Sequence, residues 1–416
     1  MRHAKCSIDK QLARAAAEDP VRRRTRRIEA FVPDYRRFVR DLASSCCRIE
    51  DLADSFPALL FALATGYGTP AGREAAFAFI KAGAPLRQAA DALGLPWWLR
   101  RLPAQAFTGP LGSVPSTPEF SERIAPFIPS QPDLAGPWLE RVSYACEAGH
   151  ADFALWTGRQ LRGPKPLACE RTFLELTAWA WHALHPDTPG HGLLRRPWEP
   201  SISTRRASEE VGAWRHRIAL DLCLGAGLAD TWLAEGSALG YEFVALRTAH
   251  DFIVEAEAMD NCLDQYAHRL ECGTVRVFSV RRQDRIVADL EIAAHEHEFG
   301  MPMITQLKSA RNRRAPLEVW QAAYAWLGGQ SIRPAAADLA LLGGGDRERR
   351  MIELWRPYLE TLSVAHRRRF ESVVLDIGKN GVRKRRQVGA GRSRIVRAGP
   401  LLGHLRGPAW RRGEMA

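Results

Sequence analysis

The sequence lacks the features of a membrane-spanning, secreted or disulfide-stabilised protein. Its apolar runs are all shorter than the roughly 18 to 20 residues that cross a bilayer, and the nearest candidate is FPALLFALATGYG. The first twenty residues contain no continuous apolar stretch, so we expect no secretion signal. The eight cysteines form no CxxC pattern, which disfavours a zinc ribbon or a disulfide framework. We therefore predict a cytoplasmic protein without a membrane span.

Motifs with a known catalytic or cofactor-binding spacing are also missing. There is no GxGxxG after a predicted strand and no GxSxG, and LLGGGDRERR lacks the lysine and Ser/Thr of a phosphate-binding loop. The HEHE stretch at 295–298 offers two histidines in an expected loop, without an identifiable third ligand. We predict neither a cofactor nor a metal.

The positive charge lies at the two ends of the chain. The net charge is +12, but residues 1–40 hold twelve Lys/Arg against five Asp/Glu, and residues 377–416 hold eleven Lys/Arg against one Glu. The segment between them is therefore mildly acidic. Basic ends bind phosphate groups through counterion release, without reading sequence. The alternative is that they are solvated ends that bind nothing specific, because runs of charge are common in proteins. Nucleic acid is a possible partner of Arg383, Lys384, Arg385 and Arg386.

Hydrophobic periodicity divides the chain into a helical part and a mixed part. Apolar residues recur at helical spacing up to about residue 185, and β-branched, alternating segments begin after residue 270. We predict an α+β fold: an N-terminal all-helical region, then a small α-β-β-β-α domain with an antiparallel sheet. The segments are a basic arm over 1–27, a helical domain over 28–185, a linker over 186–207, the α+β domain with a C-terminal helix over 208–376, and a basic disordered tail over 377–416.

The stretch EAEAMDNCLDQYAHRLECG, from 255 to 273, is predicted to form one helix that ends at its glycine. At 100° per residue its apolar positions share one side, and Glu255, Cys262 and Tyr266 lie along the edge of that side. These three side chains either form a polar pocket wall or are ordinary packing and helix-dipole residues. The residues around Cys262 do not support a lone nucleophile or a metal ligand there.

The relative facing of the strand residues depends on one turn. Two strands, TVRVFSVRR and RIVADLEIA, form a predicted hairpin, and MPMITQLKSA is a predicted third strand. A two-residue loop places Arg281 opposite Ile286 and turns Glu291 to the other face. A three-residue loop places Arg281 opposite Val287 and brings Glu291 to the same face. A slip of one residue reverses every side chain, so both arrangements stay open.

The order of these residues resembles the PcfJ-like family of conjugative plasmids and other bacterial genomes. That family has an EG-x-x-M-x-H-C-V-x-x-Y helix, a strand ending in S-x-R, a strand with T-x-E-I and a final Q-x-x-G-x-x-N. The resemblance covers about 240–325. The matching residues are Glu255, Met259, Cys262, Tyr266, Ser279, Arg281, Glu291, Ile292, Gln306 and Asn312. Ala256, Asn261 and Ser309 stand where the family has glycine, histidine and glycine.

Three functions are compatible with these patterns. The resemblance implies a protein of plasmid or mobile-element biology, with a polar site formed by Glu255, Cys262, Tyr266, Arg281, Glu291, Gln306 and Asn312, and with nucleic acid or a protein as partner. An enzyme acting on a phosphate-bearing or nucleotide substrate would use Arg281, Lys308 and Arg313 to bind the anion and Glu291 as general base. A protein-interaction module would hold the same polar residues as a buried structural network.

Overall fold

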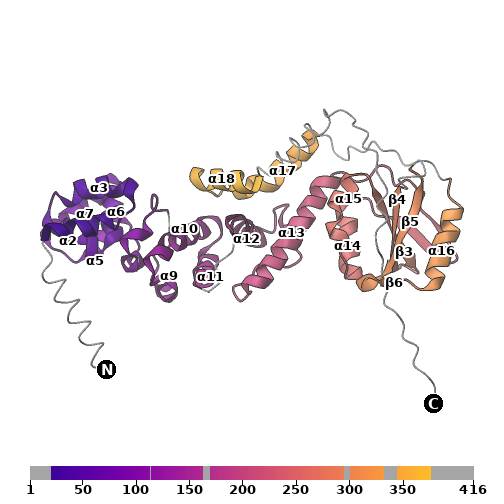
Figure 1. Ribbon diagram of the computed structural model, residues 1–416, viewed down its shortest axis with the longest axis horizontal. Helices are drawn as coiled ribbons and strands as arrows, with labels where there is room; N and C mark the ends of the chain where they lie inside the picture. Colours follow the sequence, from indigo (N-terminus) through magenta and orange to yellow (C-terminus); the bar gives the residue numbers. More distant parts are fainter. Residues whose placement is uncertain (1–19, 113, 163–168, 295–299, 332–343, 376–416) are drawn as a thin grey trace, which may run out of the picture.

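A computed structural model describes residues 20–112, 114–162, 169–294, 300–331 and 344–375. The helices of the first half follow one another along the chain, and the sheet lies at the opposite end of the molecule (Figure 1). Helix α13, Thr204–Leu224, lies between these two parts. A mixed architecture of helices followed by an antiparallel sheet, as predicted, is confirmed.

The helical part contains α2 to α12 and several short 3-10 turns. Proline at the first turn begins α3, α6, α7, α9 and α10, where its missing N–H group costs nothing. The helices are α2 Pro20–Glu29, α3 Pro33–Ala43, α4 Cys47–Glu50, α5 Leu52–Ser55, α6 Pro57–Ala64, α7 Pro70–Ala82, α8 Leu86–Leu93, α9 Pro118–Ile124, α10 Pro132–Ala148, α11 Ala151–Leu161 and α12 Glu170–Ala183. Their apolar faces form one core with several buried tryptophans, which include Trp98, Trp138 and Trp179.

The C-terminal helices pack on this helical core. Helices α17, Gly344–Leu359, and α18, Val364–Phe370, lie over α10 and α12 (Figure 1). Tyr358 of α17 is buried, and its hydroxyl is 3.1 Å from the hydroxyl of Tyr144 on α10. These helices were predicted as part of the α+β domain, yet Leu354, Trp355 and Phe370 belong to the helical core.

The segment predicted as a linker also contacts the helical core. Trp198 is 6% exposed and packs edge-on against Phe153 of α11. The indole N–H of Trp156 donates a 2.8 Å hydrogen bond to the carbonyl of Ile202. The core therefore continues through 186–207 into α13.

The sheet has six strands, where three were predicted. They form an antiparallel meander in chain order, so each strand pairs with the next one. The strands are β1 Gly236–Ala238, β2 Tyr241–Ala245, β3 Val275–Arg282, β4 Arg285–Ala294, β5 Pro302–Ser309 and β6 Arg313–Arg314. The three strands that the sequence pattern did not reveal, β1, β2 and β6, have two to five residues each and are too short for a clear alternation.

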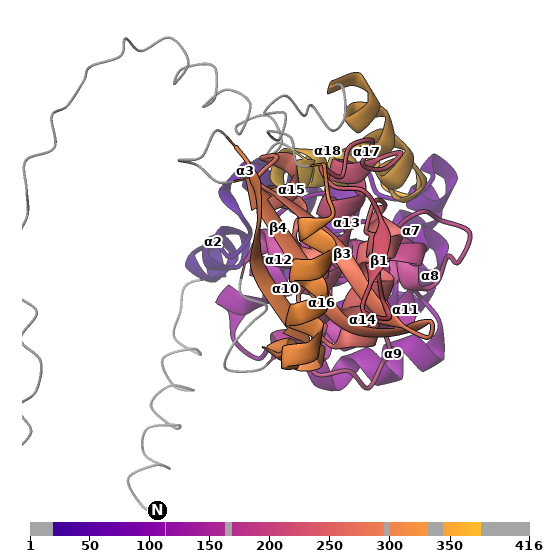
Figure 2. The same ribbon diagram turned by 90° about the vertical axis from the view of Figure 1, so that its right-hand side faces the viewer.

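Helices cover both faces of the sheet. Helix α16, Leu317–Gly328, packs Trp326 on Phe243 and Phe278 at one face, which is turned to the viewer in Figure 2. Helices α14, Ala249–Met259, and α15, Ala267–Glu271, cover the other face together with the end of α13. A polar site on this second face therefore lies between the sheet and the segment that contains α14 and α15.

The predicted helix from 255 to 273 is wrong as a single element. Helix α14 begins at Ala249, with Thr248 and Asp251 forming a reciprocal capping box, and it ends at Met259. Asp260 then adopts a left-handed conformation with φ of 50° and terminates the helix. The chain continues through a 3-10 turn, Leu263–Gln265, into α15. Glu255 thus lies on a different element from Cys262 and Tyr266.

Candidate functional site

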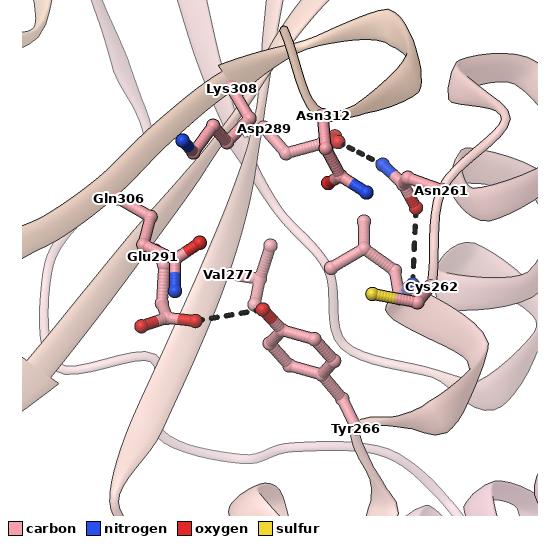
Figure 3. A pocket seen from close by; sticks show the side chains of 10 residues that line it. Asn261, Cys262, Tyr266, Val277, Asp289, Glu291, Gln306, Lys308 and Asn312 are labelled. Atoms are coloured by element: carbon pink, nitrogen blue, oxygen red, sulfur yellow. Dashed lines mark hydrogen bonds between the residues drawn. The ribbon is translucent and has the colours of Figure 1, made fainter. Parts of the chain in front are cut away.

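A small open pocket lies where the chain between α14 and α15 faces strands β3, β4 and β5 (Figure 3). Five of the seven predicted site residues line it, namely Cys262, Tyr266, Glu291, Gln306 and Asn312. The other lining residues are Asn261, Leu263, Val277, Asp289 and Lys308. The break in the helix thus turns Cys262 and Tyr266 toward the strands.

Two bulges place the polar strand residues on the pocket side of the sheet. The β3–β4 loop has two residues, Gln283 and Asp284, both with positive φ, so Arg281 pairs with Ile286. A bulge beside Arg281 then shifts the register, so that Val277 lies opposite Glu291. The sequence predicted either a two-residue loop or a shared face for Arg281 and Glu291. Because of the bulge, the structure has the two-residue loop and the shared face together.

A second bulge, on β5, completes the arrangement. Glu291 lies opposite Gln306, and Asp289 lies opposite Lys308. Thr305 is the extra residue at this bulge, and its hydroxyl turns back to the Glu291 carboxylate at 2.6 Å. The register therefore places the Glu291 carboxylate beside the Gln306 amide and the Asp289 carboxyl beside the Lys308 ammonium group.

The Glu291 carboxylate is buried and saturated with hydrogen-bond donors. It accepts hydrogen bonds from the Tyr266 hydroxyl at 2.8 Å, from the Thr305 hydroxyl and from both terminal nitrogens of Arg269. Burial alone would raise the pKa of Glu291, but the donors, Arg269 foremost, outweigh it and lower the pKa. Glu291 is therefore a fixed anion that holds Tyr266 and Arg269, and it is poorly suited to the general-base role predicted for it.

Tyr266 is held as a neutral hydroxyl by the same contact. Burial raises its pKa, and the hydrogen bond to Glu291 and the negative charge of that carboxylate raise it further. The hydroxyl thus keeps its proton, donates a hydrogen bond to Glu291 and forms a wall of the pocket.

Glu255 and Asp289 form a second acidic group behind the pocket wall. Glu255, on α14, is 1% exposed, and Asp289, on β4, is 6% exposed. Burial, a hydrogen bond with Glu255 and the charge of Glu255 raise the pKa of Asp289 to about 9, against the smaller opposing effect of Asn261. Glu255, a predicted site residue, does not line the pocket.

Arg281 lies outside the pocket, contrary to its predicted place in the site. It sits near the turn end of β3, opposite Glu242 of β2. Its Nε donates a 3.1 Å hydrogen bond to the Ser279 hydroxyl. The alternation along β3 does place Arg281 on the same face as Val277, but the pocket lies nearer the other end of the strand.

Two segments with left-handed backbone lie next to the lining residues Asn261 and Asn312, and we call this edge the mouth of the pocket. Arg311 and Asn312 follow β5 with φ of 59° and 56°, and Asp260 ends α14 with φ of 50°. A 3.1 Å ion pair between the Arg311 Nε and the Asp260 carboxylate joins the two segments. Non-glycine residues in this region cost conformational energy and cluster at functional sites.

Cys262 has an exposed thiol at this mouth. His268 lies near Cys272, at 3.8 Å, and not in the pocket lining. The pocket lining therefore offers Cys262 no histidine, and Cys262 is a wall residue of the pocket.

Sequence reasoning missed Arg269 and Thr305 and gave Asn261 no role. Asn261 holds the turn, because its side-chain oxygen accepts the Leu263 N–H at 3.1 Å while its amide donates to Asp289. Arg269 lies on α15 and meets Glu291 only through the fold. The alternation of Asp289 and Glu291 along one strand was the one signal that pointed to a second acidic residue.

Two predicted features lie outside the described residues. These are the basic residues Arg383, Lys384, Arg385 and Arg386 and the HEHE stretch at 295–298. Within the described ranges, no group of three or more His, Cys, Asp or Glu side chains could hold a metal ion. No helix in those same ranges is long and apolar enough to span a bilayer.

Comparisons with protein-family models, with curated proteins and with solved structures find no match for this chain.

Proposed function

We propose that the protein binds a phosphate-bearing ligand of the nucleotide class at the pocket of its α+β unit. The single observation that carries this proposal is a set of free donors. Lys308, Gln306 and Asn312 line the pocket, and within the described part of the chain their side chains donate no hydrogen bond to another protein group. An ammonium group beside two amides is suited to an anion with several acceptor oxygens.

The fixed residues around these donors support ligand binding over a purely structural network. Glu291, Tyr266 and Arg269 satisfy one another, so they form a rigid wall. Lys308 and Gln306 line the pocket from the adjacent strand, and within the described residues neither side chain is hydrogen-bonded to this network (Figure 3). Of the three cations predicted to bind the anion, Lys308 lines the pocket, whereas Arg281 and Arg313 do not.

Calorimetric titration with ATP, and with adenosine as a ligand without phosphate, tests the proposal. We expect ATP to bind and adenosine to bind much more weakly. Lys308→Ala should weaken ATP binding about tenfold, since it removes one charge-assisted hydrogen bond. Arg285→Ala loses the same charge from an exposed position at the start of β4 and should bind as the wild type does. Equal binding of adenosine, or an unchanged affinity of Lys308→Ala, would contradict the proposal.

The cellular setting is also a proposal. The order of Glu255, Tyr266, Glu291, Gln306 and Asn312 supports a PcfJ-like protein of plasmid or mobile-element biology, since four of these residues meet at one pocket. A cytoplasmic location is supported by the free state of the seven cysteines in the described ranges.

Nucleic-acid binding by the basic C-terminal segment is a second proposed function, based on its charge. The segment 377–416 holds eleven Lys/Arg and one Glu. Removal of 379–416 should weaken DNA binding and reduce its dependence on salt concentration. An unchanged affinity and salt dependence would exclude this role.

A further inference from the structure

Two buried carboxyl groups meet behind the pocket without a basic partner. Glu255 comes from α14 and Asp289 from β4, two elements that pack against each other, and both side chains are almost fully buried. In the described ranges neither forms an ion pair. The contrast is Glu291, two residues along the same strand, which is neutralised by Arg269. Two adjacent carboxylates in a buried position repel each other, so one of them is expected to keep a proton.

The orientation of Asn261 shows which oxygen of Asp289 already accepts a hydrogen bond. The Leu263 N–H can only donate, so the Asn261 atom that it contacts must be the amide oxygen. The amide nitrogen of Asn261 therefore donates to Asp289 Oδ2. Two buried oxygens remain without a partner, Asp289 Oδ1 and Glu255 Oε1. One proton between these two oxygens satisfies both.

The other ionisable groups near the pair leave this proton in place. Lys308 faces Asp289 from β5, while Cys262 and Tyr266 face it across the pocket. Arg311 at the mouth is occupied by Asp260. Lys308 is the one Lys or Arg of the pocket lining, and within the described part of the chain it lies opposite Asp289 without forming an ion pair with either carboxyl.

We propose that Glu255 and Asp289 share one proton, so that the pair carries a single negative charge beside the pocket at neutral pH. Asp289 lines the pocket, whereas Glu255 acts through Asp289 and is a positioning residue. When the shared proton is lost to solvent in alkali, the pair carries two negative charges, which oppose an anion bound in the pocket. This inference rests on the proposed binding of an anionic ligand.

Sulfate is a suitable probe because it stays a dianion over the whole range and has no titration of its own. We expect wild-type affinity for sulfate to fall about tenfold between about pH 7 and about pH 10, as the pair gains its second negative charge. Asp289→Asn should lose this alkaline decline, because the amide cannot ionise. Glu255→Gln should move the decline to lower pH, because Asp289 is then free of the neighbouring charge.

Lys308→Arg is the matched control, because arginine keeps its charge across this range. An alkaline decline that persists in Lys308→Arg belongs to the carboxyl pair, and one that disappears belongs to the lysine and would overturn the inference. A decline that persists in Asp289→Asn, or one that Glu255→Gln does not shift, would also overturn it.

A titration of the carboxyl ¹³C resonances in the free protein separates this inference from the proposed function. We expect Asp289 to titrate in the alkaline range in the wild type and at lower pH in Glu255→Gln. If sulfate and ATP do not bind while this alkaline titration is present, the proposed function is wrong and the shared proton stands. If they bind while Asp289 titrates in the acidic range, the shared proton is wrong and the proposed function stands.

Discussion

At the scale of single residues, two carboxylates on one strand have opposite environments. Glu291 is surrounded by donors that stabilise its charge, whereas Asp289 is next to a second carboxyl that opposes ionisation. They are two residues apart and share one face of β4. Their difference comes from the helix that covers each of them: Arg269 of α15 pairs with Glu291, whereas Glu255 of α14 is the neighbour of Asp289.

Replacing Glu291 by glutamine should destabilise the protein by about 2–3 kcal/mol at neutral pH. The estimate is below that for a fully buried pair because Arg269 is 41% exposed. Glu291 has a lowered pKa, so its contribution is present above its ordinary value of 4.5 and is lost as the pH falls through the lower folded value. The difference between variant and wild type should therefore shrink in acid.

Urea unfolding of Glu291→Gln at several pH values checks this expectation. Glu242→Gln is the matched control, because Glu242 is exposed on β2 of the same sheet. It should change the free energy of unfolding by less than about 0.5 kcal/mol. A loss in Glu291→Gln that is equal at acidic and neutral pH would show that the charge of Glu291 contributes nothing.

At the scale of elements, the break between α14 and α15 creates the pocket. Had α14 continued past Met259, Cys262 and Tyr266 would have been part of the same helix and would not have been turned toward the strands. The break occurs at Asp260, which adopts a conformation that aspartate and asparagine tolerate better than most residues. Asn261 then holds the turn through the Leu263 N–H.

Asp260→Gly should therefore stabilise the protein by about 0.5–1 kcal/mol, because glycine adopts positive φ without strain. The lost ion pair with Arg311 costs little, since both side chains are about three-quarters exposed. Asp260→Ala removes the same ion pair but keeps the Cβ, so it should destabilise the protein. Thermal unfolding of the two variants gives the comparison, and equal effects would contradict the assigned strain.

The sequence could predict the helical and strand content of this region but not the break or the register. The apolar positions of 255–273 stay in phase with a helix on both sides of Asp260, and no glycine or proline marks the interruption. The two bulges likewise have no signature in the composition. The first places Glu291 on the same face as Val277, and the second sets Gln306 and Lys308 opposite Glu291 and Asp289. The sequence therefore identified five of the ten residues that line the pocket. It misplaced Glu255 and Arg281, and for Arg281 the shared face did not reveal that the residue lies too far along β3.

At the scale of the whole molecule, α17 closes the helical core from a position far along the chain. Tyr358→Phe leaves the buried Tyr144 hydroxyl without its partner and should cost about 1–2 kcal/mol. Tyr358→Ala also opens a cavity and should cost about 3–5 kcal/mol. Tyr324→Ala, on α16, is the control with the same change of side chain, because Tyr324 is 60% exposed.

Chemical denaturation followed by tryptophan fluorescence checks this order of effects. Most of the tryptophans near Tyr358 belong to the helical core, including Trp181 and Trp355. If Tyr358→Ala unfolded at the same denaturant concentration as Tyr324→Ala, the docking of α17 would be unimportant for stability.

Helix α13 has a mechanical consequence for the pocket. Its 21 residues form a rod about 30 Å long. Trp214 belongs to the helical core, while Leu220 and Leu224 belong to the core under α14 and α15. The buried Arg217 between them holds Glu257 and Asp264, one on each side of the helix break. A rotation of α13, driven from the helical part, would move both sides of the break together. The helical part and the pocket are therefore mechanically connected through α13.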